Sequence, residues 1–289
     1  MNIESFLNRI WYSRLTIWAA LLWPLSLLFA LLANINALLF KLKIKKSSRL
    51  PVPVVVVGNI SVGGTGKTPL TVYLAQELTK LGWRVGIISR GYARQGSDAN
   101  APLAVTPHSD PLDVGDEPLL LARLSRVPVF VARQRALAGQ ALLAAHPEVN
   151  LLLCDDGLQH YALARDVELC VIDGARELGN GLRLPAGPLR EPSSRLQSVN
   201  AMVFNGRLDS SWPVEQYPPQ FAMSLQAAAA YQLNNPNRLR NAADFKDDAL
   251  TAMPGIGNPA RFFATLRKLN YPFIEQAMPD HHAFTLADL

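Results

Sequence analysis

Two kinds of apolar pattern divide this chain. Residues 15–40 carry no charged side chain, and at a rise of about 1.5 Å per residue a helix of this length can cross a hydrocarbon core of about 30 Å. From residue 53 onward, short runs of β-branched and other apolar residues alternate with stretches at helical spacing. The runs predict strands at residues 53–59, 84–89, 127–132, 149–156, 168–173 and 201–205.

Strands that are apolar at every position and separated by helices are typical of a parallel sheet covered on both faces. We therefore expect an α/β fold with three parts. Residues 1–48 form a membrane-associated helical segment, residues 49–217 the sheet domain, and residues 218–289 a smaller α/β domain. In the last part, residues 250–269 predict a strand, a glycine turn and a helix that Asn258 caps and Pro259 begins. The chain ends soon after a further motif, so we expect this domain to be incomplete.

The N-terminal apolar segment allows three arrangements. It can span the bilayer, it can form two short helices that meet near Pro24 and enter one leaflet, or it can pack on the protein itself. Trp11, Tyr12, Trp18 and Trp23 favour a position at the membrane interface. The segment contains no group with evident chemistry, so its expected role is localisation.

Charge adds a preference for anionic partners. The net charge is +5 and the isoelectric point about 9.3, and part of the excess lies just after the apolar segment. The positive-inside rule places this cluster in the cytoplasm. The basic residues are not interleaved with aromatic residues, which argues against nucleic-acid binding. The basic cluster after the apolar segment consists of Lys41, Lys43, Lys45, Lys46 and Arg49. The two cysteines, Cys154 and Cys170, lie in apolar runs and are expected to be buried thiols.

A glycine-rich loop follows the first predicted strand of the sheet and precedes a helical stretch. Strand, glycine loop, Lys-Thr and helix is the context of a P-loop, in which backbone N–H groups bind the phosphates of a nucleotide such as ATP. Lys67 is expected to reach the β- and γ-phosphates and Thr68 to hold Mg²⁺. Ser61 stands where the general pattern has glycine. The predicted nucleotide-binding residues are Ser61, Val62, Gly63, Gly64, Thr65, Gly66, Lys67 and Thr68.

The predicted strand at residues 149–156 ends in two carboxylates, Asp155 and Asp156. An aspartate at a strand end beside a P-loop holds Mg²⁺ directly or through water, and the sequence does not distinguish which of the two does so. Arg183 and Arg190 follow in a proline-rich stretch, where guanidinium groups are suited to bind phosphate. The pattern as a whole predicts a P-loop kinase or ATPase.

Eight short motifs occur in an order that resembles one family. They are GNISVGGTGKTP, SRGYAR, GDEP, DDGLQH, GNGLRLPAGPLREP, FNG, PGIGNPARFF and PDHHAF. Together they resemble the tetraacyldisaccharide 4′-kinase family, the lipid A 4′-kinases of Gram-negative bacteria, from about residue 10 to the end. The family usually continues beyond the position of Leu289.

The resemblance implies a P-loop NTPase-like fold and a reaction at the cytoplasmic face of the inner membrane. The γ-phosphate of ATP would pass, with Mg²⁺, to the 4′-hydroxyl of an acylated glucosamine disaccharide 1-phosphate lipid, forming lipid IVA in lipid A biosynthesis. It also implies a catalytic pair, Asp116 as base and His281 as its partner, beside the catalytic Lys67. No obligate protein partner is implied.

A second class of protein has a similar loop. Membrane-surface ATPases of the deviant Walker A class carry a lysine just before the Gly-Gly pair, where this chain has Val62. Their membrane helix is usually C-terminal, whereas the apolar segment of this chain is N-terminal. Both differences favour the kinase.

Overall fold

A computed structural model gives the fold and divides the chain into two compact units, Met1–Ser224 and Leu225–Leu289. It describes residues 3–13, 16–91, 101–206, 216–227, 229–233, 235–246, 248–256, 259–279, 282, 284–285 and 288. The expected start of the smaller domain, residue 218, lies seven residues before this division, because residues 220–223 form a strand of the first unit's sheet.

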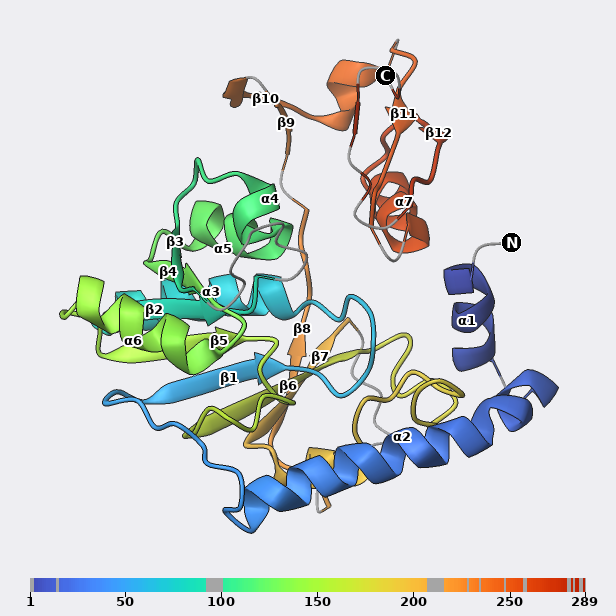
Figure 1. Ribbon diagram of the computed structural model, residues 1–289. Coiled ribbons are helices and arrows are strands. Elements are labelled where there is room, and N and C mark those ends of the chain that lie inside the picture. The colour runs from blue at the N-terminus through green and yellow to red at the C-terminus, as the bar shows by residue number, and fades with distance from the viewer. Residues whose placement is uncertain are drawn as a thin grey trace. The chain divides into compact units, whose positions relative to one another are not determined.

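The first unit is built on an eight-stranded sheet with the order β3-β4-β2-β5-β1-β6-β7-β8 (Figure 1). All six predicted strands are present, and all neighbours pair in parallel except β3 with β4, which are antiparallel. The two edge strands, β3 and β8, were not predicted. The strands are β1 (Val54–Gly58), β2 (Val85–Ser89), β3 (Leu103–Val105), β4 (Val129–Val131), β5 (Leu151–Asp155), β6 (Val167–Asp173), β7 (Ala201–Asn205) and β8 (Gln220–Met223).

Helices cover both faces of this sheet, as expected of parallel strands. Successive residues of β5 show the two faces, because their side chains point in opposite directions. Leu152 packs in one cluster with α6 (Arg135–Ala145) and η1 (Ser193–Ser198). Leu153 packs in another with α3 (Lys67–Lys80) and α5 (Asp116–Ser125), which the short α4 (Pro111–Val114) precedes. Cys154 and Cys170 are buried free thiols, as predicted.

The N-terminal segment forms α1 (Ile3–Trp11) and one long helix, α2 (Ile17–Lys41), which continues through Pro24. The expected alternative of two short helices meeting near Pro24 is therefore wrong. Helix α2 begins after Thr16, whose hydroxyl accepts a hydrogen bond from Ala19 N at 3.2 Å and caps the helix. Among the described helices, α2 alone is long and apolar enough to cross a membrane by length and composition.

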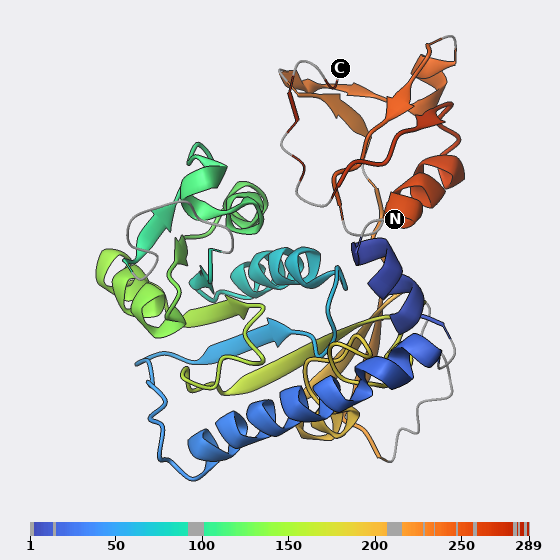
Figure 2. The ribbon, with the colours of Figure 1, turned by 45° about the vertical axis from the view of Figure 1, so that its right-hand side comes forward.

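One face of α2 is attached to the sheet domain along the middle of the helix (Figure 2). Ser26 Oγ donates to Arg183 O at 3.0 Å and accepts from Ala186 N at 2.9 Å. The Arg183 guanidinium donates to Ala30 O and to Asn34 Oδ1. The interpretation of Arg183 as a phosphate-binding residue is thus wrong, because its side chain is engaged in holding α2.

The C-terminal unit contains small two-stranded sheets and one longer helix. Helix α7 begins at Pro259 as predicted, while the expected cap Asn258 lies outside the described residues. The elements are β9 (Ala230–Gln232), β10 (Asn235–Arg240), η2 (Ala242–Phe245), β11 (Thr251–Ala252), α7 (Pro259–Lys268) and β12 (Ile274–Glu275). Strands β9 and β10 pair antiparallel, and β11 and β12 pair in parallel.

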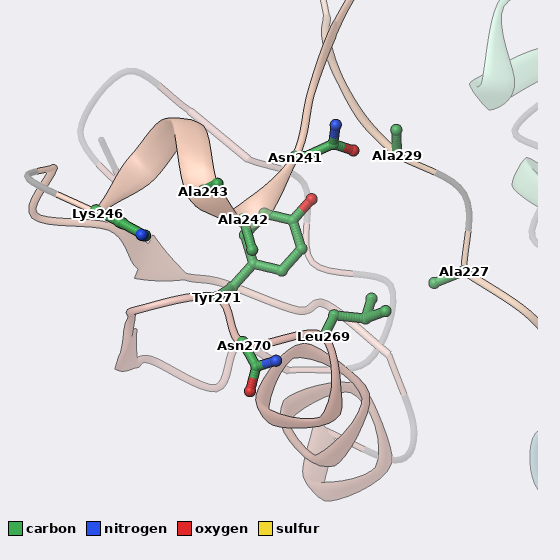
Figure 3. A pocket seen from close by; sticks show the side chains of 9 residues that line it. All are labelled: Ala227, Ala229, Asn241, Ala242, Ala243, Lys246, Leu269, Asn270 and Tyr271. Atoms are coloured by element: carbon green, nitrogen blue, oxygen red, sulfur yellow. The ribbon is translucent and has the colours of Figure 1, made fainter.

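A pocket of about 430 Å³ lies within this unit (Figure 3). Of its lining residues only Lys246 is charged, so the lining offers no group of carboxylates or histidines for proton or metal chemistry. The lining residues are Ala227, Ala229, Asn241, Ala242, Ala243, Lys246, Leu269, Asn270 and Tyr271.

Candidate active site

The predicted phosphate-binding loop joins β1 to α3 at the carboxyl end of the sheet, where ligands bind in open α/β folds. Gly63 and Gly66 have φ angles of 106° and 98°, a region that residues with a side chain rarely adopt. At Gly66 a Cβ would also lie 2.4 Å from Asn205 Nδ2. Both glycines are therefore required by the loop's backbone path.

A segment far along the chain fastens the first half of the loop. Ser61 pairs with Leu189 in an antiparallel bridge, and Val62 N donates to Pro188 O at 2.8 Å. Arg190 N donates to Ile60 O at 2.7 Å. This extended pairing explains why serine suffices where the general P-loop pattern has glycine, and it brings Arg190 to the loop.

Two asparagines hold the middle of the loop through Thr65. Asn59 Nδ2 donates to Thr65 Oγ1 at 3.2 Å, and Asn205 Nδ2 donates to Thr65 O at 2.9 Å. All three residues are buried. Asn205 belongs to the FNG motif at the end of β7, so this motif serves the P-loop.

Asp155 ends β5 as a fully buried carboxyl group. Its Oδ1 accepts a hydrogen bond from Thr71 Oγ1 at 3.2 Å, whereas its Oδ2 is buried without a hydrogen-bond partner among the described residues. Burial, aided by the negative charge of Glu117, raises the pKa of Asp155 to about 7. A buried carboxylate with one unsatisfied oxygen is suited to bind a cation.

Asp156 is surrounded by positive charge instead. Its φ of 46° is left-handed, a conformation that aspartate tolerates better than most residues. Its carboxylate accepts from Arg190 Nη2 at 2.9 Å and Nη1 at 3.3 Å, and lies 3.7 Å from Lys67 Nζ. Burial opposes ionisation, but the charges of Lys67 and Arg190 prevail and lower the pKa of Asp156 to about 2. Asp156 therefore stays ionised at neutral pH.

A third cation near this centre was missed by the sequence analysis. Arg135 opens α6, is buried, and donates to Asp156 O at 2.5 Å. The sequence could have indicated Arg135, because it lies shortly after the predicted strand at residues 127–132. The segments that follow parallel strands lie at the same edge of the sheet.

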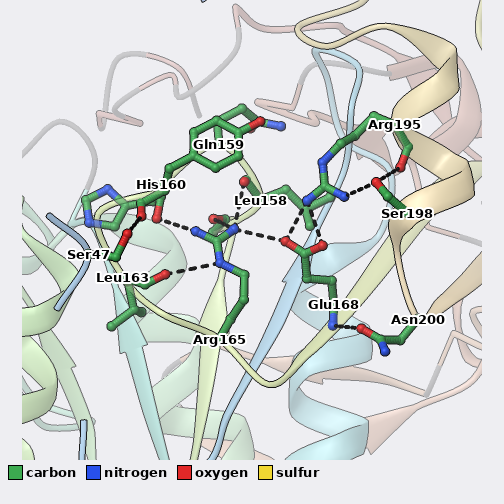
Figure 4. A network of polar contacts seen from close by, with 12 residues as sticks. Ser47, Leu158, Gln159, His160, Leu163, Arg165, Glu168, Arg195, Ser198 and Asn200 are labelled. Carbon is green, nitrogen blue, oxygen red and sulfur yellow. Dashed lines mark hydrogen bonds and ion pairs between the residues drawn. The ribbon is translucent and has the colours of Figure 1, made fainter. Parts of the chain in front are cut away.

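The conformation of the loop after Asp156 is held by Arg165 (Figure 4). The Arg165 guanidinium donates to the backbone oxygens of Leu163, Leu158 and His160. Arg165 in turn pairs with Glu168 at 3.0 Å, and Arg195 binds the same carboxylate at 2.5 Å. This partly buried Arg–Glu–Arg cluster fixes the DDGLQH loop in place.

Two side chains of that loop reach the LREP motif. Gln159 Nε2 donates to Glu191 Oε2 at 2.8 Å and to Asn59 O at 2.9 Å, while the Tyr161 hydroxyl donates to Glu191 Oε1. Burial, followed by the charges of nearby arginines, lowers the pKa of His160 to about 4, so His160 is neutral at pH 7. The loop thus links the two carboxylates to the segment that fastens the P-loop.

The structure describes only one member of the predicted catalytic pair, Asp116. Asp116 is exposed as the first residue of α5, and its neighbour Glu117 is near enough to Asp155 to affect the pKa of that residue. His281 lies outside the described residues. The adjacent His282 packs edge-on against Phe284, and its Nε2 lies 3.2 Å from Asp288 Oδ2.

The residues at the P-loop fit a nucleotide and a magnesium ion. The positive φ angles of Gly63 and Gly66 form the cradle, and at Gly64 a Cβ would meet nothing within 4 Å. Among the described residues no group of three or more carboxylate, histidine or cysteine side chains is placed to hold a metal. A nucleotide-bound Mg²⁺ does not need one, because it takes few protein ligands beside phosphate oxygens and water. Thr68 and the unsatisfied oxygen of Asp155 suit that coordination.

Comparisons with known proteins agree on one family. A sequence model of the LpxK family, described as tetraacyldisaccharide-1-P 4′-kinase, matches residues 18–289. The tetraacyldisaccharide 4′-kinase of Dechloromonas aromatica is 52% identical over 99% of this chain and 84% of its own length. The protein of the same name from Chromobacterium violaceum is 52% identical over 96% of this chain and 81% of its own length. The crystal structure of LpxK from Aquifex aeolicus in complex with ATP has a TM-score of 0.74 and 30% identity, and covers 91% of this chain and 82% of its own.

The partly buried cluster of Arg165, Glu168 and Arg195 generates a stability prediction. Arg165→Met should lower the free energy of unfolding by about 3–5 kcal/mol, because it leaves Glu168 less compensated and several carbonyl oxygens without a donor. Urea denaturation followed by circular dichroism measures the change. Arg49→Met is the matched control: its ion pair with Asp166 is exposed, so a loss under about 1 kcal/mol is expected. Equal losses in the two variants would contradict the structural role of Arg165.

Proposed function

The chain belongs to the tetraacyldisaccharide-1-phosphate 4′-kinase family, and we propose that it transfers the γ-phosphate of ATP to the 4′-hydroxyl of a tetraacyldisaccharide 1-phosphate. It is a kinase with an α/β P-loop fold. The observation that carries the proposal for its site is the meeting of Lys67, Asp156 and Arg190 beside the P-loop, in residues that the family motifs supply. The product would be lipid IVA, an intermediate of lipid A biosynthesis.

The P-loop residues Ser61 to Thr68 would bind the phosphates, with Lys67 directed to the β- and γ-phosphates. Asp156 has a supporting role in this proposal. Its carboxylate holds the ends of Lys67 and Arg190 in place before the nucleotide arrives, so the two cations do not have to be ordered on binding. Arg190 would then contact a phosphate oxygen of the nucleotide.

Thr68 and Asp155 are the residues that would hold Mg²⁺. The assignment favours Asp155 over Asp156, because Asp155 Oδ2 has no described partner while both oxygens of Asp156 accept from Arg190. Bound Mg²⁺ would neutralise phosphate charge as the γ-phosphoryl group leaves.

Asp116 is the proposed general base and His281 its partner. Asp116 is exposed at the start of α5, where an incoming hydroxyl group could reach it. The charge of the next residue, Glu117, raises the pKa of Asp155. The proton of the 4′-hydroxyl would pass to Asp116 as the oxygen attacks phosphorus. The choice of His281 as the partner rests on the family resemblance of the PDHHAF motif.

We further propose that α2 lies in the plane of the membrane at the cytoplasmic face of the inner membrane. Ser26, Ala30 and Asn34 bind the sheet domain near the middle of the helix, and a helix fastened there cannot have its middle in the hydrocarbon core of a bilayer that it crosses. Its remaining surface exposes large apolar side chains that suit an interfacial helix. They include Ile17, Trp18, Leu21, Trp23, Leu25, Leu28, Leu31, Leu32, Ile35 and Leu38.

The ATPase of the deviant Walker A class is the weaker alternative. Val62 occupies the position of that class's additional lysine, and it packs in an apolar cluster with residues of α1 and α2. The site therefore has no cation at this position of the loop.

The nucleotide assignment predicts that Lys67→Ala and Thr68→Ala abolish phosphoryl transfer while the protein stays folded. Arg190 and Arg135 remain next to Asp156 when Lys67 is removed, and Thr68 makes no side-chain hydrogen bond to another described residue, so the protein should stay folded. Transfer of labelled phosphate from ATP to the lipid, with circular dichroism as the folding control, tests this. Turnover close to that of the unchanged protein in either variant would refute the assignment.

The proposed pair predicts that Asp116→Ala lowers kcat by about 10²- to 10⁴-fold with little change in ATP affinity. His281→Ala should lower kcat less, because it acts through Asp116. In the double variant the losses should be smaller than the product of the two single effects. Steady-state kinetics of the three variants measures this, and losses that multiply fully would show that the residues act independently.

The membrane assignment predicts that replacing Leu21, Leu28 and Leu32 together by serine lowers binding to phospholipid vesicles at least about tenfold, since each leucine loses the gain of leaving water. Sedimentation with vesicles measures the bound fraction. The matched control replaces Leu81, Leu103 and Leu112, which are also exposed but lie in the sheet domain outside α2. Unchanged binding in the first variant, or equal losses in both, would count against α2 as the membrane contact.

A further inference from the structure

A cation that the mechanism above does not use borders the P-loop. Arg176 follows β6, the strand next to β1, and Asp173 Oδ1 fixes the turn by accepting from Ala175 N at 2.9 Å and Arg176 N at 3.2 Å. The turn directs the guanidinium to the loop, where Nη1 lies 3.7 Å from the position that a Cβ on Gly63 would take. Glycine at this position leaves the backbone open to the cation.

The N-terminal segment holds this guanidinium from the other side. Arg176 stacks on the ring of Tyr12 with a separation of 4.8 Å, and the Tyr12 hydroxyl donates to Val62 O at 3.4 Å. Tyr12 is therefore in contact with both the cation and the P-loop backbone. Burial raises the pKa of Tyr12 while the charge of Arg176 lowers it, and the net direction is upward. The ring thus acts as a neutral support.

The position of Tyr12 is itself fixed by the segment that fastens the P-loop. Trp11 Nε1 donates to Pro185 O at 2.8 Å, and Trp11 O accepts from Asn180 N at 2.8 Å. Trp11 is buried, so the end of α1 is anchored rather than free. An arginine stacked on an anchored ring is pre-organised, which reduces the entropy lost when it binds a ligand.

The charge environment of Arg176 differs from that of three other arginines in the site. Arg165 and Arg195 pair with Glu168, and Arg190 pairs with Asp156. Within the described part of the chain, no carboxylate forms an ion pair with the Arg176 side chain. A half-buried guanidinium beside a phosphate-binding loop, supported by a ring and not by a carboxylate, is suited to an anion from outside the protein.

From these contacts we infer that Arg176 is a further phosphate-binding residue, which contacts the terminal phosphoryl group of the nucleotide while Tyr12 holds it in place. The inference rests on the proposed function, since it takes ATP as the nucleotide. As the acceptor oxygen forms its bond to phosphorus and the bond to the β-phosphate oxygen breaks, ADP leaves with the bonding electron pair. Lys67 and Arg176 would stabilise the charge on the transferred group together. The segment before α2 then contributes to phosphate binding as well as to localisation.

Binding of two nucleotides separates this role from a structural one. In the full chain in detergent micelles, Arg176→Met should weaken the β,γ-imido analogue of ATP about 10- to 100-fold, the usual effect of losing a charge-assisted hydrogen bond to phosphate. ADP should bind within about twofold of the unchanged protein, because it lacks the terminal phosphoryl group. Arg176→Lys should recover part of the loss, and Tyr12→Leu should show a smaller loss of the same selective kind. Isothermal titration calorimetry gives both dissociation constants.

Controls make the result decisive. Arg84→Met removes an exposed arginine at the amino end of β2, at the opposite edge of the sheet, and should change neither constant. Equal weakening of both nucleotides by Arg176→Met would show that the residue only shapes the loop. If Arg176→Met weakened the binding of neither nucleotide, or raised only the KM for the lipid, Arg176 would not be a nucleotide-binding residue. If the unchanged protein bound neither nucleotide, the proposed function would fail and this inference with it.

Discussion

The architecture of the site depends on one electrostatic constraint: Asp156 directly follows a buried strand, and the negative charge of its carboxylate must be compensated there. Asp155 and Asp156 follow four buried apolar residues of β5. Uncompensated charge in such a place costs several kcal/mol. The compensation comes from Lys67, Arg190 and Arg135, which lie on separate segments of the chain. Because these three cations surround Asp156, the P-loop, the LREP motif and α6 lie together at one edge of the sheet.

The same constraint prepares the protein for its substrate. Asp156 satisfies two cations that a nucleotide would otherwise have to order, whereas Asp155 retains an oxygen without a described partner. Two neighbouring residues of one type thus have opposite surroundings, and their pKa values move apart, to about 7 and about 2. In the proposed reaction this difference assigns them different tasks, metal binding for Asp155 and cation placement for Asp156. Arg176, supported by a ring in place of a carboxylate, adds positive charge that is not already neutralised.

Much of this was predictable from the sequence, and the failures have physical causes. Uniformly apolar strands and the P-loop pattern gave the central sheet, because local periodicity determines both. The edge strands β3 and β8 are short, and β3 exposes two of its three residues, so neither shows that periodicity. The roles of Arg183 and Arg135 depend on which distant segments they meet, which spacing along the chain does not reveal. Pro24 lies inside a continuous helix because the apolar environment expected around α2 and its contacts with the domain outweigh one lost backbone hydrogen bond.

The central claim, a kinase that needs a lipid acceptor, is tested most directly by ATP turnover with and without an acylated glucosamine disaccharide 1-phosphate. ADP release and the appearance of a second phosphomonoester on the lipid, followed by ³¹P NMR in mixed micelles, give the two rates. The account predicts that ADP forms in step with the new phosphomonoester and that its release falls to background without the lipid. ATP hydrolysis at the same rate in the absence of the lipid would contradict it.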